Sequence, residues 1–292
     1  MATSRLTGAS VMLATAICVA AANDTGAQPA APPASPPASA ASPHGDMTEL
    51  AKATQNPVSD LVSLPFQFNF NTGGDLEDRT SLNINFQPVL PFKLSDDWSM
   101  ILRTILPIDS VPVGEGVSSG IGDIQEQVYL SPARPGRIIW GAGPVFSLPT
   151  ATARPLVTGT WGVGPGVVVV KNIQHVVLGG LINQIWPMSD EGDGRETNQM
   201  LLQPFVNFNF GSGWAVAVAP IITANWNAPS GDEWTVPLGL GITRTTVLGS
   251  RPMNIGVQYY YNVERPEGAA ANTLRFTLSL LFPKAHHASP QR

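Results

Sequence analysis

The stretch "NQMLLQPFVNFNFGSGWAVAVAPIITANW" (residues 198–226) consists of two runs of alternating side chains joined by a Gly-Ser-Gly turn. Polar residues Gln203, Asn207 and Asn209 share one parity of the first run. The other parity is apolar: Met200, Leu202, Pro204, Val206, Phe208 and Phe210. A period of two is that of a β-strand, whose successive side chains point to opposite faces. The fold therefore depends on which face of such strands meets water.

The composition excludes several classes of protein. Only 13% of the 292 residues are charged, against roughly 25% in an ordinary soluble domain, and 43% are hydrophobic. Outside a short N-terminal stretch, no run reaches the ~18 apolar residues of a membrane-spanning helix, which excludes a helical membrane protein. The net charge is −5 without a basic block, so we do not expect nucleic acid as a partner.

The N-terminus predicts export. Arg5 precedes the apolar run "LTGASVMLATAICVAAA", and small Ala20 and Ala22 suit a cleavage site. We predict a signal peptide over residues 1–22, with an alternative cut as late as residue 27. The only cysteine, Cys18, lies in this peptide, so the exported chain would have neither a thiol nor a disulfide. Residues 23–45 are rich in Pro, Ala and Ser and are predicted to be a disordered linker.

A short helix is predicted next, over residues 46–56. Asp46 and Glu49 have the spacing of a capping box, and Asn56 before Pro57 would end the helix. From Leu61 the two-residue period recurs in about twelve segments, near the ~9–11 residues that cross a bilayer at a tilt. They lie at residues 61–71, 81–92, 97–107, 120–131, 137–148, 160–171, 175–187, 198–210, 214–226, 234–247, 253–263 and 273–283.

The links between these segments alternate in length. Short links occur at residues 94–97, 131–136, 171–174, 211–213 and 248–252, while the links between them, such as 108–120 and 187–196, are longer. Short turns on one rim and long loops on the other are typical of outer-membrane barrels. We therefore predict an all-β fold, a closed antiparallel up-and-down transmembrane barrel of about twelve strands over residues 59–283, with a C-terminal tail at 284–292.

Tryptophan and the last strand support this interpretation. An indole is favoured between acyl chains and water, so we expect an aromatic girdle at the two membrane interfaces. Seven tryptophans fall at the predicted strand ends: Trp98, Trp140, Trp161, Trp186, Trp214, Trp226 and Trp234. The segment "NTLRFTLSLLFPK" resembles the closing strand that barrel-assembly machinery recognises, although ten residues follow Phe282. The Phe-rich face is then expected to meet lipid.

The opposite parity predicts a polar lumen walled by amides with few charges. Its candidate lining residues are Arg103, Asp123, Gln125, Gln127, Asn207, Asn209 and Arg275. A sparse charge dominates the field of a narrow pore, so Arg103, Asp123 and Arg275 are the candidate determinants of selectivity. The alternative is structural: the three form an internal salt bridge or hold the N-terminal helix as a plug.

Two acidic features leave alternatives open. Glu126 shares parity with the apolar residues of its strand, so either a bulge resets the register after Gly122 or Glu126 lies near an interface. The loop "SDEGDGRE" (residues 189–196) could bind a divalent cation or bridge to lipopolysaccharide phosphates, but it lacks a full calcium-loop pattern. A solvated surface loop is the preferred interpretation.

No catalytic arrangement is recognisable. His175 stands at a predicted short turn and the other histidines in the tails, with no serine and acid partner in pattern. The Gly-rich "WGVGPG" lacks the lysine and the helix of a phosphate loop, and its glycines would permit strand curvature. We therefore expect no enzymatic activity, no cofactor and no bound metal.

Several stretches resemble one bacterial family. They are "ELAKATQNPVSDLVSLPFQFNFN", "SSGIGDIQEQVYLSP", "WGAGPVFSLPTAT", "WGVGPGVVVV" and "NQMLLQPFVNFNF". Together, over about residues 47–283, they resemble the outer-membrane proteins of the meta-pathway phenol-degradation family, often called transporters. The resemblance implies a porin-like barrel that admits aromatic or other small organic solutes, and it supplies no catalytic residues.

The sequence thus predicts a porin-like channel for passive uptake of small organic solutes, aromatic ones among them, in the outer membrane of a Gram-negative bacterium. Its expected partners are outer-membrane lipid and lipopolysaccharide, the barrel-assembly machinery and the solute. The alternative is a structural or adhesive barrel with an occluded lumen and functional surface loops.

Overall fold

The computed structural model describes residues 43–74, 79–153, 156, 160–188 and 198–282. The predicted signal peptide, most of the predicted linker, the acidic loop 189–196 and the C-terminal tail lie outside these residues. The described part begins with one helix, α1 (Pro43–Thr54). It starts three residues before the predicted helix, so Asp46 lies within it and not at its N-cap. Pro43 suits this position because the first turn has no backbone N–H bond to lose. No described helix is long and apolar enough to span a membrane.

The rest of the described chain is almost entirely strand. The segments are β1 (Val62–Thr72), β2 (Ser81–Phe86), β3 (Val89–Lys93), β4 (Trp98–Val113), β5 (Gly116–Ile121), β6 (Ile124–Pro132), β7 (Ile139–Leu148), β8 (Gly162–Ile173), β9 (Val176–Pro187), β10 (Gln199–Gly211), β11 (Trp214–Val218), β12 (Ile222–Asn225), β13 (Trp234–Leu248), β14 (Arg251–Glu264) and β15 (Asn272–Phe282).

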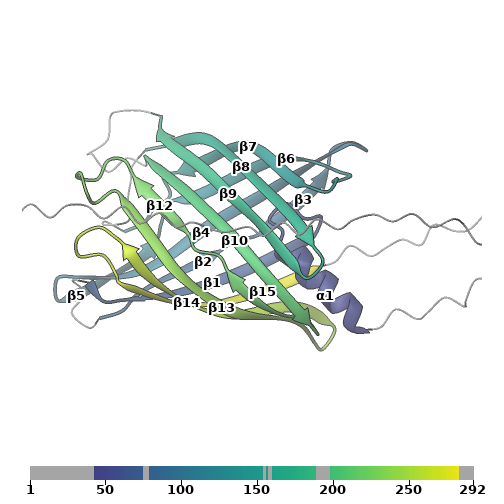
Figure 1. Ribbon diagram of the computed structural model, residues 1–292. Coiled ribbons are helices and arrows are strands. Elements are labelled where there is room, and N and C mark those ends of the chain that lie inside the picture. Colours follow the sequence, from purple (N-terminus) through teal and green to yellow (C-terminus); the bar gives the residue numbers. More distant parts are fainter. Residues whose placement is uncertain (1–42, 75–78, 154–155, 157–159, 189–197, 283–292) are drawn as a thin grey trace, which may run out of the picture. The chain divides into compact units, whose positions relative to one another are not determined.

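These segments form a closed antiparallel barrel (Figure 1). Each barrel strand pairs with the barrel strands before and after it in the chain, and β1 pairs with β15. The strands β9 and β10 pair from Ile185↔Gln199 to Val176↔Phe208. Short breaks divide three strands into the pairs β2 and β3, β5 and β6, and β11 and β12, so the fifteen segments make twelve barrel strands. The predicted fold class and strand number are confirmed. Closure gives every strand two neighbours, so no open edge remains, as a bilayer requires.

One predicted long loop is in fact a hairpin. β4 continues to Val113 and pairs with β5 across residues 108–121, where the sequence predicts a loop at 108–120. The register also shifts by one residue between Ile105↔Gln125 and Ile108↔Ile121, which is a bulge around Gly122. The bulge lies before Glu126, which pairs with Thr104 and keeps the outward parity.

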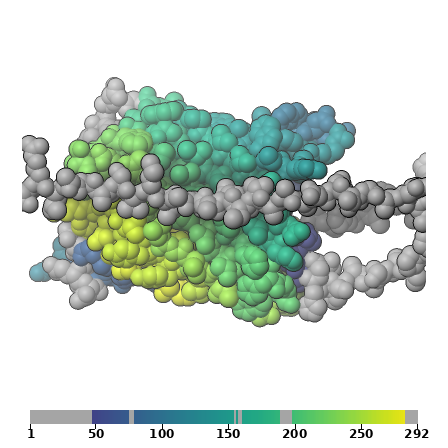
Figure 2. Space-filling model, in the orientation of Figure 1, coloured from purple at the N-terminus to yellow at the C-terminus, as the bar shows by residue number. Residues whose placement is uncertain are grey.

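The apolar face of the strands is the outer one. On β10, Val206, Phe208 and Phe210 are 48%, 51% and 52% exposed, while Asn207 and Asn209 are 7% and 1% exposed. Figure 2 shows the outer surface of the green and yellow strands, which include β13, β14 and β15. An apolar exterior combined with buried amides is the reverse of a soluble domain, and it is the arrangement expected of a barrel whose solvent is lipid.

Tryptophan side chains lie at both ends of this surface. Trp98 packs edge-to-face on Trp140 at the short-turn rim, with ring centroids 6.1 Å apart. Trp226 and Trp234 make the same contact at the long-loop rim, at 5.6 Å. Three further tryptophans stand at strand ends. The Arg244 guanidinium lies 4.9 Å from the ring centre of Trp214, and Trp161 and Trp186 are exposed.

Candidate functional site

The barrel interior has two different walls. One wall is polar and comes mainly from β1, β2, β14 and β15, with buried Asn69, Gln258, Asn262 and Arg275. The other comes mainly from β6 to β10 and is largely apolar, with an internal cluster on which Val58, Val89 and Ile101 also pack. The cluster comprises Val58, Val89, Ile101, Tyr129, Val168, Val170, Val177, Leu181 and Phe205. Inside β6 to β10, buried amides such as Asn183, Asn207 and Asn209 therefore stand among apolar side chains.

Inward glycines give the apolar wall its shape. A Cβ on Gly166 would lie 2.7 Å from Val145 Cγ2 and 3.0 Å from the Tyr129 hydroxyl, so the ring of Tyr129 occupies the space that a side chain would need. Gly143 and Gly164 leave even less room, because a Cβ there would overlap the carbonyl oxygens of Val128 and Gln184. These glycines therefore allow close approach of neighbouring strands, as the sequence indicated.

Arg103 points inward from β4 between two amides. Its Nη1 donates to Gln127 Oε1 at 3.1 Å and its Nη2 donates to Gln87 Oε1 at 2.8 Å. Gln127 is fully buried, and its Oε1 also accepts from the Tyr129 hydroxyl at 3.2 Å. Two neutral amides therefore hold the guanidinium in place, and Tyr129 holds one of them, Gln127.

Arg275 occupies a similar environment on β15 and is only 6% exposed. Its Nε donates to Asn69 Oδ1 at 2.8 Å, and its guanidinium lies over the Tyr260 ring at 4.8 Å, a cation–π contact. A long contact of 3.5 Å joins Nη1 to the Ala219 carbonyl. The partners of this cation are thus an amide, a carbonyl and an aromatic face.

In the part of the chain that the structure describes, neither lumen arginine forms the internal salt bridge considered as an alternative. Among the residues that the structure describes, the ion pairs are Glu49 with Lys52, Asp96 with Lys93, and Asp97 with Arg134, and all lie at the short-turn end. All hydrogen-bond and ring partners of Arg103 and Arg275 in this part of the chain are neutral.

Of the other candidate lumen residues, Asp123 lies at the long-loop end, and Gln125, Asn207 and Asn209 lie farther inside the barrel. Asp123 is placed at the start of β6, where its carboxylate accepts from the Ala151 backbone N–H at 2.9 Å and so holds the segment after β7. Gln125 pairs with Ile105 of β4 and points inward. Asn207 is buried inside β10, and Asn209 contacts the N-terminal part of the chain. The structure therefore brings Gln127 to Arg103 and leaves Asp123 at the long-loop end.

A cavity of about 220 Å³ lies between the two walls. Amides and small polar side chains provide much of its surface, and Phe205, Val89 and Pro65 provide apolar surface. Among the described residues that line it, the charged ones are Arg103 and Arg275. We call it the lumen cavity.

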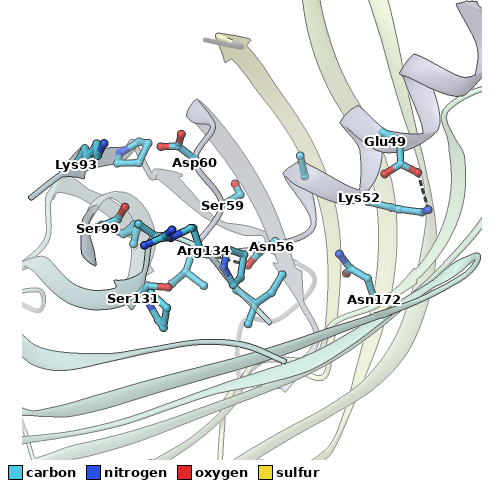
Figure 3. A pocket seen from close by; sticks show the side chains of 18 of the residues that line it. Glu49, Lys52, Asn56, Ser59, Asp60, Lys93, Ser99, Ser131, Arg134 and Asn172 are labelled. Carbon is cyan, nitrogen blue, oxygen red and sulfur yellow. Dashed lines mark hydrogen bonds and ion pairs between the residues drawn. The ribbon is translucent and has the colours of Figure 1, made fainter. Parts of the chain in front are cut away.

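A second cavity of about 690 Å³, the mouth cavity, opens at the short-turn rim (Figure 3). Its lining includes Lys93 at the end of β3, Asp96 and Arg134 of the turns, and Glu49 and Lys52 of α1. The Lys93 ammonium, which bonds Asp96 at 2.6 Å, lowers the pKa of that exposed carboxyl. Lys93 pairs with Asp96 here, and Lys52 pairs with Glu49, unlike the two arginines of the lumen cavity.

The N-terminal segment (residues 49–60) separates these two cavities. Ala53, Asn56 and Ser59 line both of them. Gln55 and Asn209 exchange amide hydrogen bonds of 2.9 and 3.1 Å, and Val58 is buried against the apolar wall. The segment thus narrows the passage at the short-turn end, where Figure 1 shows α1 beside the strand ends.

Sequence reasoning missed the apolar part of the lumen wall. Phe205 shares parity with Asn207 and Asn209, so the alternation places it inside, but the lumen residues singled out were amides and charged groups. A signal was available in the four consecutive valines at residues 167–170, because a run without polar residues predicts apolar side chains on both faces.

No other chemical site is apparent in the described residues. They contain no cluster of three or more His, Cys, Asp or Glu side chains that could hold a metal. His175 lies between β8 and β9, and its backbone carbonyl accepts from the Asn209 side chain at 3.2 Å. A third cavity, of about 380 Å³, lies by Asn225 and Asp232 at the long-loop rim.

The fold is similar to that of known outer-membrane channels. An outer-membrane channel from Pseudomonas putida F1 superimposes with a TM-score of 0.59 at 16% identity, over 76% of this chain and 96% of that one. The NanC porin (TM-score 0.48, 9% identity, 75% and 99% covered) and the CymD monoaromatic hydrocarbon channel (0.46, 8%, 82% and 93%) are more distant. No family model and no curated protein matches the chain. The barrel therefore shares its fold with the P. putida protein.

Proposed function

We propose that this protein is an outer-membrane channel of a Gram-negative bacterium that admits small organic solutes, aromatic ones among them, by passive diffusion. The observation that carries the proposal is the lumen cavity, which is lined both by hydrogen-bonding amides and by Phe205 with other apolar groups. Such a lining suits a solute that is neither a simple ion nor a pure hydrocarbon.

Three further features support the proposal. The outward apolar band and the tryptophans at both rims fit insertion between lipid and lipopolysaccharide after export and assembly by the barrel-assembly machinery. The fold similarity to the P. putida channel is consistent with a channel. The resemblance to the phenol-degradation family favours aromatic solutes, and the apolar wall could hold an aromatic ring.

The proposal assigns no enzymatic activity to the chain, because a passive channel needs none. The competing function is a structural or adhesive barrel whose lumen stays occluded and whose long loops make the contacts. The position of Ala53, Asn56 and Ser59 between the two cavities favours occlusion in the state described here. The two functions differ in whether the N-terminal segment ever leaves its place.

Single-channel conductance in a planar bilayer tests the proposal. The exported chain and a variant without residues 28–58 are refolded, and folding is verified by the heat-dependent shift of gel mobility. We expect discrete openings in both, with larger steps in the truncated variant. Folded protein that is silent in both forms would exclude the channel and favour the structural barrel.

A further inference from the structure

Among the described residues that line the lumen cavity, Arg103 and Arg275 are the charged ones, and no acid stands with them. Their partners in the described part of the chain are all neutral. A cation that is partly or wholly removed from water is stabilised best by an anion that it can also hydrogen-bond. Neighbouring amides orient the guanidinium groups but leave their charge uncompensated.

Each guanidinium also keeps donors for a ligand. Arginine carries five N–H donors, of which Arg103 uses two and Arg275 uses one good and one long bond. Both guanidinium groups are held by short bonds of 2.8 Å, to Gln87 and Asn69, so little side-chain freedom remains to be lost when a ligand binds. A planar fork of donors that is fixed in advance matches a carboxylate.

The same cavity also has apolar lining groups, among them Val89, the cross-strand partner of Arg103. Phe205, Val89 and Pro65 line it, and Phe205 and Val89 belong to the internal apolar cluster. The volume of about 220 Å³ is below the roughly 300–1,000 Å³ of typical ligand pockets, so only a small solute fits. A ligand that has both a carboxylate and a ring would contact both kinds of lining group.

We propose that the lumen cavity is a binding site for a small organic carboxylate with an aromatic or similarly apolar body, recognised by Arg103 and Arg275. The inference rests on the proposed channel function and specifies its solute class. Uncharged aromatic compounds of the same size gain only the apolar contacts, and amines of the same size are repelled by the two cations.

Calorimetric titration of the refolded exported chain in detergent tests this site, with benzoate as the probe and benzyl alcohol as its neutral counterpart. Empty micelles provide the blank. We expect benzoate to bind at least about tenfold more tightly than benzyl alcohol, because hydrogen bonds to a charged group are stronger than those to a neutral one. Equal affinities would overturn the proposal, as would folded protein that does not bind benzoate.

The matched variants are Arg103→Gln with Arg275→Gln, and Arg244→Gln as the control. Arg244 points outward over Trp214, so its replacement removes the same charge without touching the lumen. We expect the double variant to lose about tenfold or more in benzoate affinity and the control to match the parent chain. Should the double variant not fold, each single variant is expected to weaken benzoate binding, and unchanged affinity in both would overturn the proposal.

Binding and conduction fail separately. If the protein binds benzoate through the arginines but passes no current, the carboxylate site is supported and the channel function is refuted. If the protein conducts but its affinity for benzoate is unchanged when both arginines are replaced, the channel function is supported and the carboxylate site is refuted.

Discussion

Val58 gives the sharpest test of how the N-terminal segment closes the lumen. Its side chain is only 6% exposed and packs in the internal apolar cluster with Ile101, Tyr129 and Val168. A Cβ on Gly141 would lie 3.0 Å from Val58 Cγ1, so this glycine provides room for the docked valine. If the segment leaves the lumen during opening, this contact is broken.

Val58→Ala removes two methyl groups from that contact. At ~0.8 kcal/mol per buried methylene equivalent, the docked state loses ~1.6 kcal/mol, and incomplete collapse of the space raises this to about 2 kcal/mol. Since 1.4 kcal/mol corresponds to tenfold, the ratio of undocked to docked segment should rise about 10- to 30-fold. The same change in open probability is expected in single-channel recordings.

The control is Val167→Ala, which makes the same substitution at a lipid-facing, 41% exposed position of β8. It should leave the open probability within about twofold of the parent chain, because outward side chains make no contact with the segment. If Val58→Ala behaves like Val167→Ala while both fold, docking of Val58 does not control opening, and the closure mechanism is refuted.

Three further predictions concern the barrel itself. Gly164→Ala would place a Cβ against the Gln184 carbonyl oxygen and should abolish the heat-modifiable folded form, whereas Gly180→Ala, whose nearest atoms lie 3.8 Å away, should keep it. Trp226→Phe removes the 2.8 Å bond from the indole N–H to Gln184 and should lower the free energy of unfolding in lipid by about 1 kcal/mol, measured by denaturant titration; no change would mean that lipid or water replaces the bond. Glu126→Leu should raise the free energy of unfolding by about 1 kcal/mol, because Glu126 Oε1 is buried without a hydrogen-bond partner among the described residues, whereas Oε2 accepts from Thr104. A loss of stability would show that the carboxylate has a partner in the membrane.

The sequence alone determined the strands, their faces and their number. Alternation with a period of two is a local property of the sequence. The apolar face of each strand then turns outward because the surrounding solvent is nonpolar. The alternating loop lengths identified the two rims for a similarly local reason. The expected loop at residues 108–120 became a hairpin because pairing between Ile108 and Ile121 depends on the partner strand and not on local composition.

Only the tertiary structure decided what the lumen contains. Arg275 bonds Asn69, 206 positions away, and Gln55 bonds Asn209, 154 positions away. Parity could place these side chains inside but could not say which of them meet, because closure of the barrel brings together strands that are distant in the chain. For the same reason, the sequence left open whether the lumen arginines pair with acids. In the described part of the barrel both line one cavity and have neutral partners.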